Sequence, residues 1–490
     1  MAYDYDMIVI GGGAAGLTTS GIAASFGAKT LMIERHKLGG DCTWTGCVPS
    51  KTLLKTAKVA HQIRYASHYG LADQPLDFDF GKMMARLHAI REEIYEEADR
   101  PEIYEEMGIE VRFGTARFVD PHTLVLENDD GEVWVTGRYF TIAAGASPFV
   151  PPIEGIEEAP YLTNETLFEL TALPEHLAIV GAGPIGSEMA QAFRRLGARV
   201  TVIDMLDTIL TNDDPELTSM LKAVLEKEGV EYVLGAGVKR VEKTGGTMAV
   251  VVEQNGQQRT IEADALLMAT GRRANLKGLG LDEAGVAHTR HGITINNRCR
   301  TNQRHIYAIG DVTGRYQFTH MSEHMGKVAA SNAIFKFPLK IDARHVPWVT
   351  YTDPELAHVG ARERDLKKKG VTYKVYRFPY TKIDRALTDG EATGWIKVFA
   401  KPWNGKILGA TILGTAAGEM ICEYALAMRN GVTLRQISDT IHPYPTYGLG
   451  VRRAADQWYA QKQSPTLVRL LQFIFRYRGP VIEPDPDRIV

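Results

Sequence analysis

Two cysteines lie close together near the N-terminus, in the stretch GGDCTWTGCVPSK (residues 39–51). Cys42 and Cys47 are separated by four residues, and they make up half of the chain's 4 cysteines. In a protein so poor in cysteine, a close pair indicates redox chemistry or metal binding. Pro49 suits the first turn of a helix, because its missing N–H is not needed there. A helix that starts at Cys47 would favour the thiolate, because the positive end of the helix dipole lowers the pKa of the thiol.

A glycine-rich motif precedes the cysteine pair. Residues 4–35 read DYDMIVIGGGAAGLTTSGIAASFGAKTLMIER, the pattern of a buried strand, a glycine turn, a helix and a second strand. In this pattern Gly11 makes the tight turn, Gly13 lets a pyrophosphate approach the backbone, and Gly16 lets the helix pack closely on the strand. Glu34 stands 18 residues after Gly16, where an acid that binds ribose hydroxyls is expected. The motif predicts a dinucleotide site.

The same pattern recurs in HLAIVGAGPIGSEMAQAFRRLGARVTVID, residues 176–204. Gly181, Gly183 and Gly186 repeat the three glycines, and Asp204 again stands 18 residues after the last of them. A single copy would be a weak signal, since glycine-rich turns are common. Two copies between a strand and a helix, each closed by an acid at the same spacing, predict two bound nucleotides.

Length and composition describe an ordinary enzyme. With 490 residues, the chain is long enough for about three domains. Its formal net charge of -3 gives no reason to expect nucleic acid as a partner. The N-terminal MAYDYDMIVI holds two aspartates ahead of a short apolar run, unlike a secretory signal, and no uninterrupted apolar run approaches the roughly 18 residues of a membrane span. We therefore expect a cytoplasmic protein.

The later segments suggest a return to the first domain and then a change of architecture. Apolar strands that end in Gly or Gly-Asp occur in residues 139–155, 263–280 and 300–314, and the last of these is best explained by chain re-entry into the first domain. From about residue 345, VPWVTYTDPELAHVG and WIKVFAKPWNGKILGATILG predict antiparallel strands with turns, followed by helices.

Together these motifs resemble the class I pyridine-nucleotide disulfide oxidoreductases, the group of lipoamide dehydrogenase, glutathione reductase and mercuric reductase. The resemblance covers Asp4 to about Trp458 and rests on both glycine motifs, GGDCTWTGCVPSK, TIAAG, ATGRRAN, YAIGDVTG and YTDPELAHVG. It implies an α/β fold with two Rossmann-like dinucleotide-binding domains and a C-terminal α+β dimerisation domain. It also implies a homodimer in which the partner chain completes the active site.

The resemblance divides the chain into functional parts. It assigns residues 1–150 and 272–342 to FAD binding and residues 151–271 to NAD(P)H binding. Residues 343–463 form the dimerisation domain, and residues 464–490 form an apolar and basic tail.

The resemblance also gives the cysteine pair its chemistry. It makes Cys42 and Cys47 a redox-active disulfide, with Cys47 as the thiolate beside the flavin and Cys42 as the exposed thiol that meets the substrate. Two merely buried cysteines are the alternative. A zinc site is disfavoured because it needs a second cysteine pair, and Cys299 and Cys422 are isolated residues of the core or surface.

Further residues match cofactor positions of the family. Lys51 and Glu188 match an ion pair near the flavin, where hydride arrives, although two solvated surface charges are the alternative. Asp311 matches the aspartate that binds the FAD ribityl chain, although it could be a turn residue. Gly145, at the end of the TIAAG strand, is also expected to bind cofactor.

One motif resembles a metal site but is expected to be structural. HMSEH, from His320 to His324, fits H-x-x-E-H, which binds zinc on a helix. It directly follows the Gly-Asp motif, where the family has a helix under the flavin. We therefore expect these side chains to pack in the structure, and we expect no metal site.

The C-terminal run departs from the disulfide-reducing members. Those carry His-Pro-Thr and a glutamate five residues after the histidine, as the acid-base pair for thiol chemistry. Here the run is IHPYPTYGLG, with Tyr444 in place of the histidine and Leu449 in place of the glutamate. His442 lies two residues earlier, about 6.5 Å along an extended chain, too far for proton transfer without rearrangement. Tyr444 is a weak base at neutral pH, but it is a fair hydrogen-bond donor or a suitable neighbour for a soft metal site.

The tail has two interpretations. TLVRLLQFIFRYR, within residues 464–480, is apolar almost all round, with Arg469, Arg476 and Arg478 interleaved. It either packs on the dimer or forms a membrane-surface helix that gives access to quinones.

These observations predict an FAD-containing oxidoreductase that prefers NADH and has a small-molecule electron acceptor. Hydride passes from NADH to flavin, and then to the disulfide or directly to an acceptor such as a quinone. Mercuric reductase resembles the chain in having a tyrosine where this chain has Tyr444. It usually also has a C-terminal cysteine pair, which is absent here. The alternatives are therefore a mercuric reductase, a lipoamide-type disulfide reductase, or a nucleotide-binding redox sensor without turnover.

Overall fold

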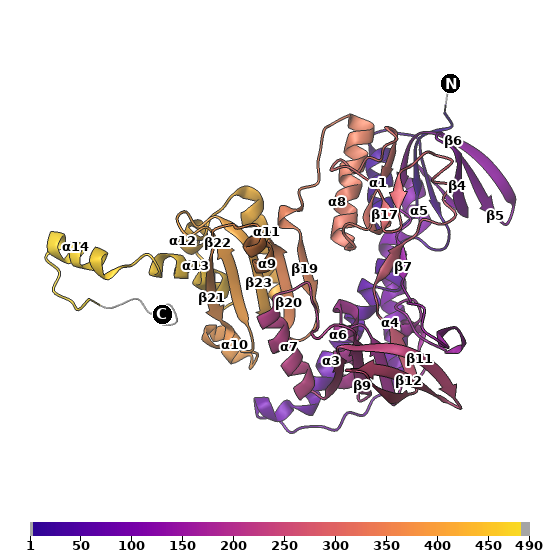
Figure 1. The fold of residues 1–490 in the computed structure, drawn as a ribbon. Helices are drawn as coiled ribbons and strands as arrows, with labels where there is room; N and C mark the ends of the chain where they lie inside the picture. Colours follow the sequence, from indigo (N-terminus) through magenta and orange to yellow (C-terminus); the bar gives the residue numbers. More distant parts are fainter. Residues whose placement is uncertain (1–2, 482–490) are drawn as a thin grey trace.

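The computed structural model describes residues 3–481. Two α/β units and a C-terminal antiparallel sheet with its helices pack together (Figure 1). The first unit lies at the upper right of the view with the N-terminus, the second lies below it, and the C-terminal sheet lies to their left. The predicted fold class, two Rossmann-like units and a C-terminal α+β domain, is confirmed. Residues 482–490 of the predicted tail lie outside the described residues.

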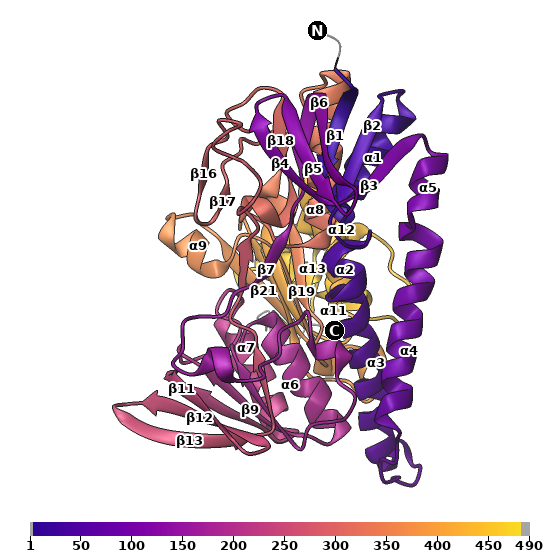
Figure 2. The same ribbon diagram turned by 90° about the vertical axis from the view of Figure 1, so that its right-hand side faces the viewer.

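The first unit is built on a parallel sheet in the order β3-β2-β1-β6-β18. Its strands are nearly continuous apolar runs because both faces of a parallel sheet are covered, and α1 and α8 pack against each other beside it (Figure 2). At its start strand β6 also pairs with β5, which in turn pairs with β4, and both pairings are antiparallel. The elements are β1 (Tyr5–Ile10), α1 (Ala14–Ser25), β2 (Thr30–Glu34), α5 (Pro101–Glu106), β3 (Ile109–Phe113), β4 (Thr115–Asp120), β5 (Thr123–Asn128), β6 (Gly131–Ile142), β18 (Ile306–Ala308) and α8 (Thr319–Ala330).

The second unit repeats this plan on a smaller scale. Its parallel sheet has the order β10-β9-β8-β14, and an antiparallel sheet of β11, β12 and β13 stands beside it. The elements are β8 (His176–Val180), α6 (Pro184–Leu196), β9 (Arg199–Asp204), α7 (Pro215–Lys227), β10 (Val230–Leu234), β11 (Ala236–Thr244), β12 (Thr247–Gln254), β13 (Gln257–Ala263) and β14 (Ala265–Met268).

The second unit is inserted into the first. The chain leaves the first unit along β7 (Ala146–Pro148) and returns along β15 (Arg272–Ala274), and these two strands are antiparallel partners. A short hairpin of β16 (His288–Thr289) and β17 (Gly292–Ile293) follows. Strand β18 then joins the first sheet beside β6. The chain thus re-enters the first unit, while the domain limits at residues 150 and 272 stay predictions.

The C-terminal region is an antiparallel sheet covered by helices. The strand order is β19-β20-β23-β22-β21, and α11 packs against β20 and β23. The elements are β19 (Pro347–Thr350), β20 (Glu355–Gly360), α9 (Glu363–Lys368), β21 (Lys374–Pro379), α10 (Asp384–Thr388), β22 (Trp395–Ala400), β23 (Ile407–Gly414), α11 (Ala417–Asn430), α12 (Leu434–Asp439) and α13 (Leu449–Ala460).

One long helix ties the units together. Helix α3 (Cys47–Arg64) begins beside the first sheet and packs against α6 of the second unit and against α4 (Phe80–Ile94). It follows α2 (Gly40–Trp44), a short helix that carries Cys42. The cysteine pair therefore lies where the first and second units meet.

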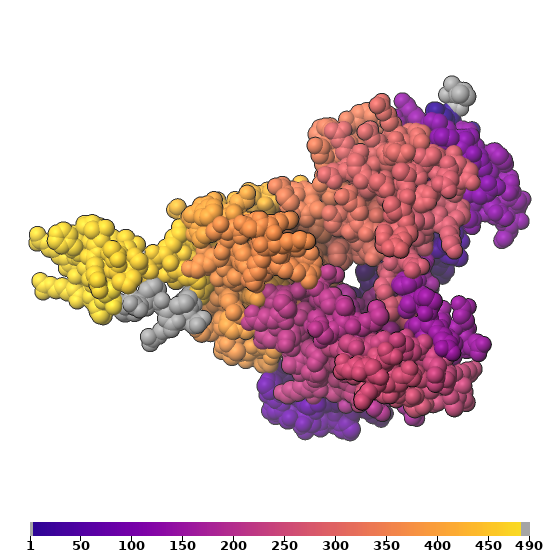
Figure 3. All heavy atoms as spheres, in the orientation of Figure 1, coloured from indigo at the N-terminus to yellow at the C-terminus, as the bar shows by residue number. Residues whose placement is uncertain are grey.

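The last helix stands apart from the rest. Helix α14 (Pro465–Phe475) projects from the far side of the C-terminal region and buries none of its residues (Figures 1 and 3). In the part of the chain that is described, no helix has the length and apolar character needed to cross a membrane.

The two glycine motifs have the same local structure. Gly11 and Gly181 have φ angles of +109° and +111°, a region that side chains rarely adopt. A Cβ added to Gly16 would lie 1.8 Å from the Gly11 carbonyl oxygen, and one added to Gly186 would lie 1.9 Å from the Gly181 oxygen. Glycine at these positions therefore lets α1 and α6 start directly against their turns.

Gly186→Ala should destabilise the second unit. The new methyl group would force the turn away from α6, at a cost of about 1–3 kcal/mol, and differential scanning calorimetry should show a lower unfolding temperature. Gly183→Ala is the matched control, because nothing lies within 4 Å of the position of its Cβ. An equal loss of stability in both variants would contradict this account of the turn.

Candidate active site

Glycines bring the cysteine pair against the first nucleotide motif. Gly39, with a φ angle of +95°, donates its N–H to the Gly12 carbonyl oxygen at 2.9 Å. A Cβ on Gly40 would lie 2.8 Å from the Gly13 Cα atom. A Cβ on Gly46 would lie 2.7 Å from the Asp41 carbonyl oxygen, so the chain can turn back tightly from α2 into α3. The glycine pair ahead of the cysteines thus serves close backbone packing.

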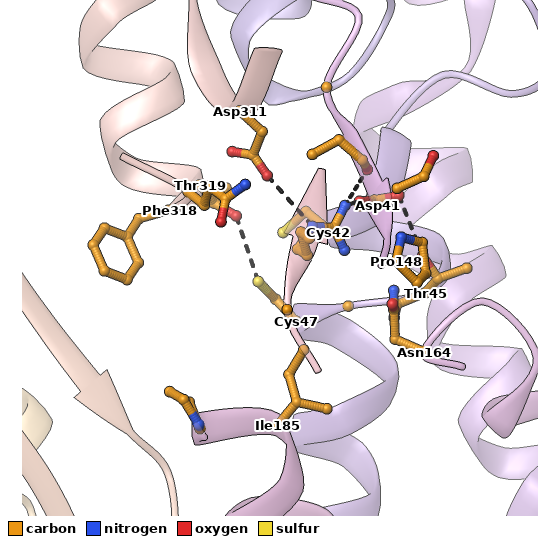
Figure 4. Close-up of a pocket in the computed structure, with 18 of the residues that line it drawn as sticks. Asp41, Cys42, Thr45, Cys47, Pro148, Asn164, Ile185, Asp311, Phe318 and Thr319 are labelled. Carbon is orange, nitrogen blue, oxygen red and sulfur yellow. Dashed lines mark hydrogen bonds and ion pairs between the residues drawn. The ribbon is translucent and has the colours of Figure 1, made fainter. Parts of the chain in front are cut away.

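The surroundings of the two thiols shift their pKa values in opposite directions. Both cysteines are free thiols in this structure, and Cys47 is the first residue of α3, as predicted. Cys47 is exposed, whereas Cys42, which was expected to be the exposed thiol, is half-buried. A hydrogen bond with Cys42, a Thr319 hydroxyl 3.4 Å from Sγ and the Lys51 ammonium lower the pKa of Cys47 to about 6 (Figure 4). The hydrogen bond with Cys47 and desolvation raise the pKa of Cys42. In the reduced pair Cys47 is therefore the thiolate, and Cys42 keeps its proton.

Helix α4 and the π-helix that follows it (Tyr95–Asp99) hold the loop between the cysteines. Thr43 donates its hydroxyl to the buried Asp99 carboxylate at 2.6 Å. The Trp44 ring packs against Tyr95 with ring centroids 5.2 Å apart, and Arg91 donates to the Trp44 carbonyl oxygen at 3.0 Å. Thr43 and Trp44 thus hold the loop against α4 and the π-helix.

The structure brings Lys51 and Glu188 together. Lys51 Nζ lies 3.0 Å from Glu188 Oε2, and the Glu188 side chain is only 6% exposed. The other carboxylate oxygen of Glu188 accepts the Tyr351 N–H at 2.8 Å, while Lys51 Nζ lies 4.4 Å from the centre of the Tyr351 ring. A buried carboxylate requires such partners, so the ion pair joins α3, α6 and the start of the C-terminal region.

Arg272 links Asp311 to the cysteine loop. Its guanidinium forms an ion pair with Asp41, next to Cys42, and its Nε lies 3.7 Å from Asp311 Oδ2. Burial raises the pKa of Asp311, and the charge of Arg272 opposes this effect. Arg272 belongs to the ATGRRAN motif, but no local pattern predicts a role for it, because its partners lie far away along the chain.

The two acids at the ends of the nucleotide motifs accept hydrogen bonds from the backbone of their own glycine turns. Glu34 Oε2 accepts the Gly12 N–H at 2.7 Å, and Asp204 Oδ2 accepts the Ala182 N–H at 2.6 Å. Each carboxylate also has lone pairs left for a ligand hydroxyl. The structure therefore gives these acids a structural contact in addition to the predicted ribose contact.

One large cavity joins these groups. It has a volume of about 2650 Å³ and is lined by both glycine turns, both cysteines and the Lys51–Glu188 pair. The sequence-predicted residues that line it are Gly11, Gly13, Glu34, Cys42, Cys47, Lys51, Gly145, Gly181, Gly183, Glu188, Asp204 and Asp311. Gly16 and Gly186 are absent from this lining and serve packing instead.

The cavity suits two dinucleotides. At Gly183 and Gly145 the space beside the backbone is open, and α1 and α6 begin at the two turns, where helix N-termini favour phosphate. The residues at the first turn, with Asp311 and Lys51, would hold FAD, and those at the second turn would hold the nicotinamide dinucleotide. Bound there, the two cofactors supply hydride transfer.

The C-terminal run has no free base. Tyr444 is exposed, and a hydrogen bond with Asp384 raises its pKa. His442 Nε2 lies 3.0 Å from Glu423 Oε1, and its Nδ1 lies 3.0 Å from the Thr440 carbonyl oxygen, so both ring nitrogens are occupied. Residues 441–449 do not line the cavity of their own chain. The predicted contribution of Tyr444 to a partner's active site stays a prediction.

Of the remaining candidates, His320 and Cys422 line the large cavity, and Cys299 and His324 do not. His320 is within hydrogen-bonding distance of the Pro347 carbonyl oxygen, at 2.9 Å, and it shares α8 with His324. In residues 3–481, no group of three or more His, Cys, Asp or Glu residues could hold a metal ion. Cys299 is fully buried. Cys422 is exposed on α11 and lines the large cavity, which the sequence did not indicate.

Comparisons with known proteins agree with this site. The chain matches the family pyridine nucleotide-disulphide oxidoreductase over residues 5–326 and the dimerisation domain of that family over residues 346–455. It is 34% identical to a mercuric reductase of Staphylococcus aureus over 453 residues, 92% of this chain and 82% of the relative. It is 33% identical to a dihydrolipoyl dehydrogenase of Bacillus subtilis over 466 residues, 93% of this chain and 98% of the relative. It also resembles the Cu(II) complex of the HOCl-induced flavoprotein disulfide reductase RclA from Escherichia coli, with a TM-score of 0.83, 27% identity and coverage of 93% of this chain and 99% of that one.

The chain therefore belongs to the pyridine nucleotide-disulphide oxidoreductases. It is a flavoprotein oxidoreductase with Cys42 and Cys47 as its redox pair, in a family that binds FAD and NAD(P)H. The sequence resemblance is confirmed, as is the prediction of an enzyme in place of a sensor without turnover. The dimerisation domain supports a homodimer. The relatives differ in substrate, so the family alone does not name the electron acceptor.

Reduction of the FAD-loaded enzyme by NADH should produce a long-wavelength absorbance band, because the Cys47 thiolate donates charge to the oxidised flavin. Since the pKa of Cys47 is lowered to about 6, the band should be present at neutral pH and fade as the pH falls through about 6. Cys47→Ser should bind FAD but lack the band, and a persistent band in this variant would contradict the assignment.

Thr319 provides the control for this pH titration. Thr319→Val removes the hydroxyl 3.4 Å from Cys47 Sγ, so the midpoint of the band should move to higher pH. Thr319→Ser keeps a hydroxyl and should restore the original midpoint.

Proposed function

We propose that the protein is an NADH-dependent flavoenzyme whose acceptor takes electrons without thiol acid-base catalysis, with a quinone favoured. The observation that carries this proposal is the C-terminal run. Tyr444 and Leu449 stand where the family's disulfide reductases have their histidine and glutamate. His442 is engaged at both ring nitrogens by Thr440 and Glu423.

The residue roles follow from the family resemblance and the contacts at the site. We assign Cys47 as the thiolate beside the flavin and Cys42 as the thiol that exchanges with a substrate. Lys51 and Glu188 form the ion pair at the point of hydride arrival, and Asp311 binds the FAD ribityl chain. The same proposal divides the chain at residues 150, 272 and 343, with the nicotinamide domain inserted in the FAD domain.

A soft metal ion is the second candidate acceptor. The relatives include mercuric reductases, and the related RclA structure is a Cu(II) complex. A thiolate at Cys47 beside Cys42 is a suitable ligand pair for soft metals. The chain has no cysteine after Cys422, so it lacks a C-terminal cysteine pair that would capture mercury. The missing cysteine pair therefore favours a quinone over mercuric ion as the electron acceptor.

The preference for NADH rests on Asp204. Its carboxylate lines the cavity at the end of β9 and bonds to the Ala182 and Leu206 amides, which hold the negative charge in place. No lysine or arginine occurs in residues 204–221 to attract a 2'-phosphate.

NADH should therefore exceed NADPH in kcat/KM by about ten-fold or more, because a carboxylate beside a phosphate costs several kcal/mol. Steady-state kinetics with both nucleotides tests this. Asp204→Asn removes the charge but keeps a polar side chain of the same size, so it should reduce the ratio of kcat/KM for NADH to kcat/KM for NADPH. A wild-type preference for NADPH would refute the proposal.

Lipoamide and glutathione disulfide should be poor acceptors, because the absent proton transfer typically contributes about 10²- to 10⁴-fold. The test is NADH turnover with these two disulfides, a soluble quinone and mercuric ion, for wild type and Cys42→Ser. If the quinone accepts electrons directly from the flavin, Cys42→Ser should keep most of the quinone activity.

A gain-of-function variant provides the control for this acceptor panel. Tyr444→His combined with Leu449→Glu restores the family's acid-base pair and should raise lipoamide turnover. The opposite result is a wild type that uses only a disulfide acceptor and loses this activity in Cys42→Ser. That result would contradict the interpretation that Tyr444 replaces the family's catalytic histidine and leaves the enzyme without that base.

A further inference from the structure

Helix α14 is separated from the body of its own chain. It follows α13 after a short connection and projects outward, beyond the C-terminal sheet (Figures 1 and 3). Ser464 caps its N-terminus by accepting the Leu467 N–H at 3.1 Å, and Pro465 occupies its first turn. The helix therefore has its own defined start and is no mere continuation of α13.

One side of α14 is apolar and uncovered. Leu467, Leu470, Leu471 and Ile474 have the i, i+3, i+4, i+7 spacing of one helix face, and all four side chains are exposed. Phe473, beside this face, is 84% exposed. Exposed apolar surface of this kind marks an interaction site.

The opposite side is polar and carries positive charge only. Arg469, Gln472 and Arg476 follow each other at helical spacing on that side, and Arg478 comes just after the helix. No Asp or Glu occurs between Asp456 and Glu483. A helix with bulky apolar residues on one face and arginines on the other suits the boundary between water and anionic lipid headgroups.

We propose that α14 binds the surface of an anionic lipid bilayer. The helix would lie in the plane of the surface, with Leu470, Leu471 and Ile474 in the acyl region and Arg469 and Arg476 at the headgroups. Its 11 residues are too few to span a bilayer, which needs about 20. This inference does not depend on the identity of the acceptor, although a membrane position would bring the enzyme to acceptors dissolved in lipid.

A second copy of the chain is the competing partner. The match to the family's dimerisation domain ends at residue 455, before α14 begins, so the helix lies outside the segment that this domain matches. A protein surface that covered this helix would also have to neutralise three arginines with its own acids. The charge of one sign therefore favours the lipid surface.

The test is co-sedimentation of the FAD-loaded, full-length enzyme with phosphatidylcholine vesicles and with equimolar phosphatidylcholine–phosphatidylglycerol vesicles. The wild type should sediment with the anionic vesicles, and added salt should weaken this binding. Arg469→Gln and Arg476→Gln should each weaken partitioning about five-fold, the contribution of one cation near an anionic surface. Leu470→Gln, Leu471→Gln and Ile474→Gln combined should abolish it.

Leu71→Gln is the control, because Leu71 is a leucine in another part of the molecule that is more exposed than Leu470 or Leu471. It should bind vesicles as the wild type does, and all variants should keep NADH turnover with a soluble acceptor. A wild type that remains in the supernatant with anionic vesicles would overturn the proposal. So would a triple variant that elutes as a monomer in size-exclusion chromatography, since α14 would then pack on a second copy.

Discussion

The active site depends on backbone contacts that only glycine permits. Gly40 rests against Gly13, and Gly46 lets the chain return from α2 into α3 against the Asp41 carbonyl oxygen. A side chain at either position would push the cysteine loop away from the first nucleotide turn. Because α3 begins directly at Cys47, such a shift would also move the thiol relative to Thr319. The chemistry of the cysteines is therefore set by the packing of atoms that carry no functional group.

Helix α3 places a positive charge beside the redox-active thiol. Cys47 and Lys51 are four residues apart and so lie on one face of the helix. Lys51 favours the thiolate at Cys47, while the second unit supplies the carboxylate of Glu188 that balances the ammonium. The contact between α3 and α6 thus joins the two nucleotide units and holds the charges beside the redox pair. Tyr351 adds the C-terminal region to the same arrangement.

Local patterns predicted the parts of the site that depend on local structure. The glycine turns, the start of α3 at Cys47 and the acids after the second strands all follow from short-range spacing. The Lys51–Glu188 pair was accessible only through the family resemblance, because 137 residues separate the two. The ion pair between Arg272 and Asp41 spans 231 residues, and no local signal indicates it. The bond between His442 and Glu423 was also unforeseen, since it depends on how α11 packs beside the C-terminal run.

The paired strands β7 and β15 have an architectural consequence. The second unit enters and leaves the first through two antiparallel neighbours, with Arg272 opposite Pro148. Its two ends therefore lie side by side, so a short turn could close the gap that its removal would leave. A unit with adjacent ends is a modular cassette, which one insertion event can add to an existing fold without breaking the host sheet. The second unit is therefore a closed module within the first, and the chain connects the two through the paired strands β7 and β15.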